Sequence, residues 1–233
     1  MKEACDDLDE NKVPINEQLK KLLFDTLLSC STIGILRQRE LLLFQEVGIK
    51  LNHHDDLFVK LCVIYEFKDK NIETNSITEK TILEVCDKNH WYTLNDFKNS
   101  IKYLVEIKLH KDFKYLFEIY KLSFKLYVNL ENDNENKNIL DYEMAENLWN
   151  ALLLSYKNHI VMNRWFEFYR KRLDNIDSSS NKSSINKHIG INYDLWVMFY
   201  KFISKYPTIE LIKSGYNHIE SWPLIIDDFV ETL

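Results

Sequence analysis

Glycine and proline are scarce in this sequence, and this scarcity constrains the fold more than any other feature. The 233 residues include four glycines and three prolines, fewer than half of what an average chain of this length contains. Sandwiches, barrels and propellers need such residues for a turn about every ten residues. The sequence therefore predicts helices joined by polar loops. The glycines are also isolated from one another, which excludes glycine-rich loops that bind phosphate groups.

Apolar residues recur at helical spacing along most of the chain. In the segment expected to be helical over 55–69, Leu57, Leu61 and Ile64 share one face, as an amphipathic helix requires. The sequence therefore predicts an all-α fold of about ten helices in two packed lobes. Further helices are expected over 17–29, 37–50, 140–156, 159–173 and 194–205, from 76, 93 and 208 onward, across 113–124 and across 222–233.

Capping signals and apolar stripes locate individual helices. Ser76 and Glu79 fit the capping box, in which a hydroxyl and an acidic side chain bond the free amides at a helix N-terminus. Thr93 and Asp96 repeat the pattern, so we expect a helix to begin at each pair. Single apolar stripes are expected on the helix over 113–124 (Phe113, Leu116, Phe117, Tyr120, Phe124) and on the C-terminal helix (Trp222, Ile225, Ile226, Phe229, Val230, Leu233).

Polar segments divide the chain into regions. Residues 1–15 are acidic and polar, and we expect a disordered lead-in there. The polar stretch 131–138 predicts a boundary between an N-terminal lobe over 16–130 and a C-terminal lobe over 139–233. Residues 174–189 are rich in Ser and Asn without periodicity, which predicts a mobile surface loop.

Charge and cysteine usage indicate the class of partner and the compartment. The net charge of −6 argues against nucleic acid as a partner and favours a basic protein surface. Cys5, Cys30, Cys62 and Cys86 form no C-x-x-C pair, so we expect reduced, structural thiols and a cytoplasmic and nuclear address. No apolar run approaches the ~18 residues of a membrane span, and the acidic start differs from a signal peptide.

Metal sites and calcium loops are not well supported. His53, His54, Asp55 and Asp56 are potential ligands, but adjacent helical residues point about 100° apart and do not easily close one coordination shell. An acidic helix start is the plainer interpretation. Residues 29–40 lack the oxygen ligands of a calcium loop. We expect no metal and no cofactor, and a calcium- or metal-regulated helical switch is the alternative.

No set of residues resembles an active site. The sequence has no G-x-S-x-G motif, and its seven histidines stand in unrelated contexts. Glu143 and Glu146 lie one turn apart on an expected helix, which is typical of a solvated face. The sequence therefore predicts a helical binding protein that is not an enzyme, with an enzyme lacking a known motif as the other possibility.

Two surfaces are candidates for binding. The C-terminal helix leaves Asp227, Asp228 and Glu231 beside the Trp222-Pro223 corner, either as solvated acids or as a rigid acidic patch for a basic partner. The second candidate is an apolar cluster on the helices expected over 55–69 and after 76, which is either core or a groove for an amphipathic peptide. Its members are Leu61, Ile64, Phe67, Ile77 and Ile82.

Three blocks of the sequence resemble one family. The block WPLIIDDFVE (222–231) closely resembles the C-terminal signature of the defective-in-cullin-neddylation proteins. LDYEMAENLWNALL (140–153) resembles a helix of that family, and YDLWVMF (193–199) resembles its D-x-W segment. The resemblance implies the all-helical potentiating-neddylation (PONY) fold, whose N-terminal lobe is EF-hand-like without calcium. Only 16 residues precede the first expected helix, so the ubiquitin-binding module of many members is expected to be absent, as in a fungal-like short member.

The resemblance also implies a function. Family members are scaffold-type co-ligases without catalytic residues of their own. They bind the C-terminal winged-helix domain of a cullin and the acetylated N-terminal tail of the neddylation conjugating enzyme. By holding both partners, they promote transfer of the ubiquitin-like modifier to a cullin lysine, which is catalysis by proximity and orientation. We expect such a scaffold, acting as a monomer, with no nucleic-acid or membrane partner.

The family's binding residues can be carried over position by position. The cullin-binding Asp-Ala-Asp constellation falls on Asp194, Ser221 and Asp227, with serine in place of the family's alanine. The serine keeps a small side chain and adds a hydroxyl. The family's pocket for the acetylated tail falls on Leu61, Ile64, Phe67, Ile77, Ile82, Phe124, Leu148 and Ala151.

Overall fold

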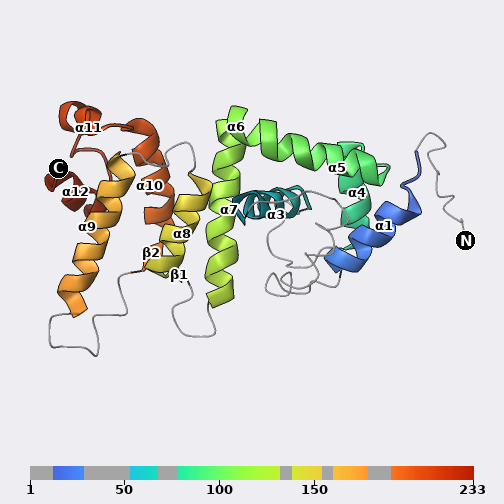
Figure 1. Cartoon of the computed structure of the whole chain (residues 1–233), viewed down its shortest axis with the longest axis horizontal. Helices are drawn as coiled ribbons and strands as arrows, with labels where there is room; N and C mark the ends of the chain where they lie inside the picture. The colour runs from blue at the N-terminus through green and yellow to red at the C-terminus, as the bar shows by residue number, and fades with distance from the viewer. Residues whose placement is uncertain (1–12, 29–52, 68–77, 132–137, 154–159, 178–189) are drawn as a thin grey trace, which may run out of the picture. The chain divides into compact units, whose positions relative to one another are not determined.

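Helices make up nearly all the regular structure of the described residues. The computed structural model describes residues 13–28, 53–67, 78–131, 138–153, 160–177 and 190–233 (Figure 1). The expected all-α fold is confirmed. The helix expected over 37–50 lies outside the described residues. The chain divides into two compact units, Met1–Tyr115 and Leu116–Leu233.

The first unit is built from short helical segments. Two of them are π-helices, in which each turn is wider than in an α-helix. Within this unit, α3 lies against α4, α5 and η3, and α4 lies against η1. The elements are α1 (Glu17–Leu23), η1 (Phe24–Leu28), α3 (His53–Phe67), α4 (Glu79–Asn89), α5 (Leu94–Tyr103), η3 (Leu104–Lys108) and α6 (Leu109–Lys111).

Helix starts in the first unit confirm one capping prediction and correct another. At α5, the Thr93 hydroxyl accepts the amide of Asp96, and the Asp96 carboxylate accepts the amide of Thr93, which is the expected capping box. At α4, the N-cap is Thr78, whose hydroxyl accepts the amide of Thr81 at 3.1 Å. The prediction that Ser76 caps this helix is therefore wrong, because a second hydroxyl residue closer to the helix occupies the cap.

Aromatic rings and a polar group hold the first unit together. Trp91 packs on Phe67 at 5.6 Å and on Phe97 at 5.0 Å between ring centroids. The hydroxyl of Tyr115 donates a hydrogen bond of 3.1 Å to Glu66. Lys108 lies 4.0 Å above the Tyr115 ring, so η3 is joined to α3 and to the first turn of α7.

The buried thiols behave as predicted for structural cysteines. Cys62 and Cys86 are buried and free, and burial raises the pKa of each to about 12. Neither side chain is a thiolate near neutral pH, which agrees with a structural role. Cys5 and Cys30 lie outside the described residues.

The second unit packs long helices around stacked aromatic rings. Figure 1 shows α8, α9 and α10 side by side, and their rings meet where Trp149 and Trp165 each contact Phe199 at 4.6 Å. The elements are α7 (Phe113–Glu131) from Leu116 onward, β1 (Ile139–Leu140), α8 (Tyr142–Leu152), α9 (Ile160–Asp177), β2 (Ile191–Asn192), α10 (Tyr193–Lys205), α11 (Ile209–Gly215) and α12 (Leu224–Glu231).

A buried hydrogen-bonded stack joins α7, α8 and α10. Tyr120 stacks on Trp196 at 4.4 Å, and Trp196 stacks on Trp149 at 5.3 Å. The Tyr120 hydroxyl donates to the carbonyl of Trp196 at 2.9 Å and accepts from the indole of Trp149 at 2.7 Å. Because the rings bury a large apolar area and their polar groups are satisfied, this stack fixes α10 against α7 and α8.

This stack lies entirely within the second unit. The two compact units divide at Tyr115–Leu116, inside α7, and the lobe boundary over 131–138 stays a prediction. Beyond that point, Tyr120 and Phe124 pack on α10 residues of the second unit. The stripe predicted for α7 is wrong at its first position, because Phe113 is 72% exposed.

Two details of the second unit differ from the sequence prediction. A two-residue antiparallel pairing joins β1 to β2, with Leu140 opposite Ile191. A side chain at Gly190 would overlap the side chain of Ile139, so glycine is required beside this pairing. Residues 174–177 of the loop expected over 174–189 belong instead to α9, which continues to Asp177, and residues 178–189 lie outside the described residues.

Other expected elements agree with the structure. Pro207 follows α10, and Thr208 caps α11, its hydroxyl accepting the amide of Leu211 at 3.2 Å. The C-terminal helix buries Ile226 and Phe229, as its stripe predicts. None of the described helices is long and apolar enough to cross a lipid bilayer.

Candidate functional site

The first turn of α12 carries the predicted acidic residue Asp227. Pro223 precedes the helix, and its carbonyl accepts the amide of Ile226 at 2.8 Å. An acidic side chain in the first turn of a helix interacts favourably with the helix dipole. The Asp227 side chain keeps 26% of its surface exposed. It is therefore held by the fold and still accessible to a partner.

Two side chains of the segment before α12 contact the Asp227 carboxylate. The hydroxyl of Tyr216 donates a hydrogen bond of 2.6 Å to Oδ1 of Asp227. His218 places Nδ1 3.8 Å from the same oxygen. Burial, followed by the hydrogen bond to Asp227, raises the pKa of Tyr216 well above its ordinary value, so Tyr216 remains a neutral donor. These contacts fix the direction of one carboxylate oxygen.

An aromatic corner positions this segment, and we define it as Phe202, Tyr206, Tyr216 and Trp222. The Phe202 ring lies edge-on to Trp222 at 5.8 Å and to Tyr216 at 6.1 Å. The Tyr206 hydroxyl donates to the carbonyl of Gly215 at 3.1 Å. The segment between α11 and α12 is thus anchored on the last turns of α10, which gives the acidic residue a rigid support.

A salt bridge closes the outer side of the aromatic corner. Lys205 contacts both carboxylate oxygens of Glu220, at 2.6 and 2.7 Å. The same ammonium group lies 5.9 Å from the centroid of the Trp222 ring. Glu220 is therefore compensated and adds little free negative charge to the surface beside Ser221.

Asp228 faces a different side of α12 from Asp227. Its carboxylate accepts a hydrogen bond of 2.8 Å from Arg172 of α9. Successive residues of a helix point about 100° apart, so the adjacent acids have different neighbours. Among the consecutive acids at the chain end, Asp227 is the one that faces the aromatic corner, whereas Asp228 is engaged in an ion pair.

Ser221 is exposed and lies among exposed apolar side chains. Ile219 is 92% exposed and Leu224 is 73% exposed. Exposed large apolar side chains therefore precede and follow this small residue along the chain. We name Ile219, Ser221, Leu224 and Asp227 the α12 surface.

Asp194 lies apart from the α12 surface. It is exposed in the first turn of α10, where the Asn192 side chain caps the helix by accepting the amide of Leu195 at 2.8 Å. Figure 1 shows that α10 begins beside β2 and ends beside α11. Eight residues separate Asp194 from Phe202 in the aromatic corner, a helical rise of roughly 12 Å. The structure thus places Ser221 and Asp227 around one corner and Asp194 towards the other end of α10.

The residues predicted for the tail pocket fall into both units. Leu61, Phe67 and Ile82 are buried in the first unit, where Ile64 is half-buried. Phe124, Leu148 and Ala151 are buried in the second unit. Ile77 lies outside the described residues. Their joint role as one pocket stays a prediction.

The structure places the other sequence candidates in structural roles. In the described parts of the chain, no group of three His, Cys, Asp or Glu side chains is arranged to hold a metal ion. His90 ends α4 in the left-handed conformation, with φ of 57°. Glu146 forms an ion pair with Arg170, and Glu143 lies exposed in the first turn of α8. Residues 53–56 form the first turn of α3.

Sequence reasoning missed Tyr216, Ile219 and Leu224. Their spacing is not periodic, and Tyr216 reaches Asp227 across the bend between α11 and α12. The signal that was available is the local alternation of apolar and polar residues around Ser221. Its meaning depends on exposure, which the sequence does not show.

Comparison with known proteins decides the family. The family described as Cullin binding matches residues 96–232, more than half of the chain. The chain belongs to this family. The resemblance based on three sequence blocks is thereby confirmed. The matched segment contains Asp194, Ser221 and Asp227, whereas Leu61 and Ile82 precede it.

Fungal relatives carry a name that agrees with this family. The protein called "Defective in cullin neddylation protein 1" of Saccharomyces cerevisiae is 26% identical, over 81% of this chain and 62% of the relative. The protein of the same name from Candida glabrata is 29% identical, over 81% of this chain and 63% of the relative. This member of the cullin-binding family thus spans less than two thirds of the length of these relatives.

Proposed function

We propose that this protein acts in cullin neddylation as a non-catalytic scaffold that binds a cullin through its second unit. The observation that carries the proposal is the Asp227 carboxylate, oriented by Tyr216 and flanked by the exposed apolar residues of the α12 surface. An oriented acid within an apolar surface is suited to a partner that presents a basic side chain among apolar ones. The cullin's C-terminal winged-helix domain is the proposed partner.

Asp194 extends the proposed cullin interface. Asp194 is exposed at the start of α10, on the same unit as the α12 surface. Two acids on different helices of one unit, Asp194 on α10 and Asp227 on α12, fit an extended basic surface better than a single small cation. Protein interfaces of ordinary size bury about 800 Å² on each partner, an area wide enough to include both sites.

The second proposed partner is the N-terminally acetylated tail of the neddylation conjugating enzyme. Support comes from the apolar character of Leu61, Ile64 and Phe124, to which the family's tail pocket corresponds. Acetylation removes the charge of an N-terminal amine, and placing that charge in an apolar site costs several kcal/mol. A monomeric scaffold in cytoplasm and nucleus that holds both partners would accelerate transfer by proximity, without residues that take part in the chemistry.

A reconstituted transfer assay tests the scaffold. Purified conjugating enzyme charged with the ubiquitin-like modifier is mixed with a cullin C-terminal domain, with and without this protein. We expect faster cullin modification with the protein present, and a return to the background rate with Asp227→Lys. Asp194→Lys should also weaken the effect. Lys201→Glu on the exposed face of α10 is the matched control and should behave as the unaltered protein.

Further measurements separate the two binding events. Calorimetry with acetylated and free-amine tail peptides should show clear preference for the acetylated form. Equal affinities would contradict the pocket while leaving cullin binding intact. Unchanged cullin affinity of Asp227→Lys, with circular dichroism confirming a folded protein, would refute the assignment of the α12 surface.

A further inference from the structure

A basic groove lies on the second unit between α9, α11 and the end of the chain. Its volume is about 820 Å³. The cations that line it are Arg164, Lys171, Arg172 and Lys213, and its apolar lining includes Phe168 and Ile209. We define the basic groove by these six residues. A cavity of this size accommodates several side chains of a short peptide segment.

The groove follows from helical spacing on two elements. Arg164, Phe168, Lys171 and Arg172 stand at i, i+4, i+7 and i+8 along α9, so they share one face. On α11, Ile209 and Lys213 stand at i and i+4. Each helix therefore contributes apolar and basic side chains to the same groove.

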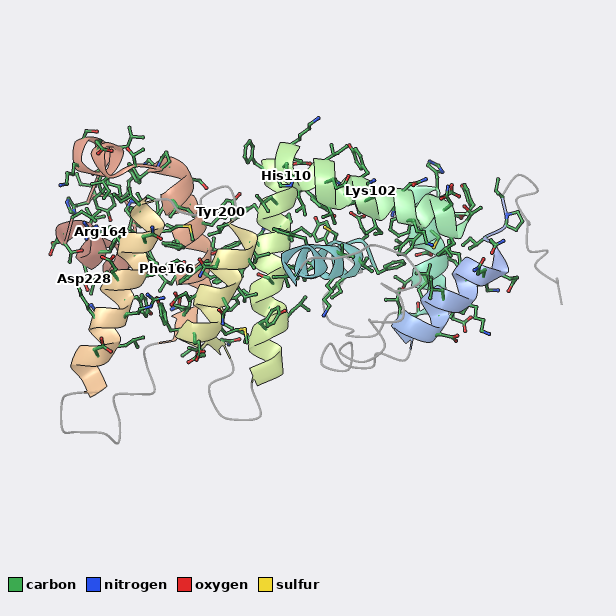
Figure 2. All side chains as sticks on the ribbon, viewed as in Figure 1. Lys102, His110, Arg164, Phe166, Tyr200 and Asp228 are labelled. Carbon is green, nitrogen blue, oxygen red and sulfur yellow. The ribbon has the colours of Figure 1, made fainter. Side chains whose placement is uncertain are left out.

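Two of the four cations are compensated within the protein. Arg164 donates to Glu167 at 3.2 Å, and Arg172 donates to Asp228 at 2.8 Å (Arg164 and Asp228 are labelled in Figure 2). Lys171 and Lys213 are exposed and form no ion pair with any residue that the structure describes. Lys213 interacts electrostatically with Glu210 of the same helix without a direct ion pair. Both ammonium groups are therefore exposed and able to contact an external anion.

The charge of the groove contrasts with that of the whole chain. The net charge is −6, so a groove lined by four cations and one acid, Glu167, is a local exception. An acidic chain gains little from the phosphate backbone of nucleic acids. The apolar floor also favours a ligand with apolar side chains, such as a peptide.

The groove is distinct from the α12 surface. Asp227 points towards Tyr216, whereas Asp228 points towards Arg172 at the edge of the groove. The two surfaces lie on different sides of α12 and carry opposite charge. A basic partner on the α12 surface would be repelled by Lys171 and Lys213, so the groove is suited to another ligand.

We propose that the basic groove binds an acidic peptide segment of a further protein partner. An apolar anchor residue of the segment packs on Phe168 and Ile209, and flanking carboxylates pair with Lys171 and Lys213. This arrangement gives the second unit two docking surfaces of opposite charge. Partners of opposite charge can then bind the same unit without competing.

Fluorescence anisotropy with the full chain tests the groove. The probe is a fluorescein-labelled ten-residue peptide of Asp and Glu around a central Leu-Phe pair. The comparison peptide replaces every Asp and Glu with Asn and Gln. We expect at least tenfold tighter binding of the acidic probe, with affinity falling as salt is raised because exposed charges are screened.

Charge-reversal variants assign the binding to the groove. Lys171→Glu with Lys213→Glu should weaken binding of the acidic probe at least tenfold, and Lys171→Gln with Lys213→Gln should weaken it less. Lys201→Glu, which lies outside the groove on α10, should leave the affinity unchanged. The reversal variant should still bind a cullin C-terminal domain, which separates this proposal from the function of the α12 surface.

Three results would overturn the proposal. The first is equal binding of the acidic and neutral peptides, and the second is full affinity in the Lys171→Glu/Lys213→Glu variant. The third is competition by a single-stranded oligonucleotide that binds more tightly than the acidic probe, which would identify the groove as a nucleic-acid site. A thermal unfolding curve that matches the unaltered protein confirms that any loss reflects the groove.

Discussion

The hydroxyl of Tyr216 lies 2.6 Å from Oδ1 of Asp227 and donates a hydrogen bond to it. The bond joins the segment after α11 to the first turn of α12. Because the donor is a rigid ring packed in the aromatic corner, the carboxylate has a fixed direction before any partner arrives. A binding group oriented in advance loses less conformational entropy when the complex forms.

Removing this donor should weaken cullin binding while the fold survives. In Tyr216→Phe, the ring still packs on Phe202, but the Asp227 carboxylate is free to rotate. We expect a loss of about tenfold in affinity for a cullin C-terminal domain, because an oriented charged hydrogen bond contributes about 1.5–3 kcal/mol. Surface plasmon resonance measures it. Tyr206→Phe removes the bond to Gly215 in the same aromatic corner but keeps the bond of Tyr216 to Asp227, so it should weaken affinity less than Tyr216→Phe.

Substitution of the neighbouring acid, Asp228, should lower stability slightly and leave cullin affinity almost unchanged. Asp228 is paired with Arg172 at 2.8 Å, with 33% and 44% of the two side chains exposed. In Asp228→Asn, we expect a loss of at most about 1 kcal/mol in unfolding free energy, as for other partly exposed ion pairs. Cullin affinity should change less than about twofold, since the complex is not expected to use this carboxylate. Urea unfolding and the same resonance assay measure both effects, and a large loss of cullin affinity would show that Asp228 contacts the partner.

The sequence could predict elements whose signals are local. The helix at Thr93 and the buried face of α12 depend on spacing within one segment, and both were predicted correctly. The sequence predicts the start of α4 two residues early, because Ser76 and Thr78 both offer a hydroxyl and only the folded chain shows which one caps the helix.

Features formed by distant residues could not be predicted in this way. The pairing of β1 with β2 joins residues about fifty positions apart, and two-residue strands leave no periodic signal. Asp227 and Asp228 are identical in the sequence, and only their neighbours Tyr216 and Arg172 distinguish them. Within α7, Phe113 continues the apolar spacing but lies exposed before the division between the units.

Because two thiols are buried, we expect the unfolding free energy to fall at alkaline pH. Burial raises the pKa of Cys62 and of Cys86 from 9.0 to about 12 in the folded state. The thiols of the unfolded chain ionise above pH 9, while those of the folded chain remain protonated, so the unfolded state binds fewer protons there. The contribution of the two protonated thiols to the unfolding free energy is therefore complete below pH 9 and is lost between about pH 9 and 12.

A double variant tests this alkaline effect. Cys62→Ala with Cys86→Ala should be less stable at pH 7, because it leaves cavities, but its stability should fall less steeply between pH 8 and 10. Urea unfolding at each pH measures the slopes. Parallel slopes for the variant and the unaltered protein would show that other groups, such as the buried tyrosines, cause the alkaline loss.

Removal of the Tyr120 hydroxyl should lower the unfolding free energy of the protein. It serves two buried groups, since it accepts from the Trp149 indole at 2.7 Å and donates to the Trp196 carbonyl at 2.9 Å. Tyr120→Phe keeps both ring stacks but leaves a donor and an acceptor buried without this oxygen. The Trp149 indole loses its partner, whereas the Trp196 carbonyl lies within α10 and still accepts the helical amide four residues on. One unsatisfied buried group costs about 1–3 kcal/mol, so we expect the unfolding free energy to fall by about 1–3 kcal/mol.

Urea unfolding followed by tryptophan fluorescence measures this loss, because Trp149 and Trp196 lie in the stack. Tyr193→Phe is the matched control, since this exposed ring packs on Phe124 of the same helix as Tyr120. It should change the unfolding free energy by less than about 0.5 kcal/mol. Equal stabilities of the two variants would mean that the stack relaxes or admits water, and that the fixed position of α10 depends on ring packing alone. A selective loss in Tyr120→Phe would show that these hydrogen bonds hold the helix that carries both Asp194 and the aromatic corner.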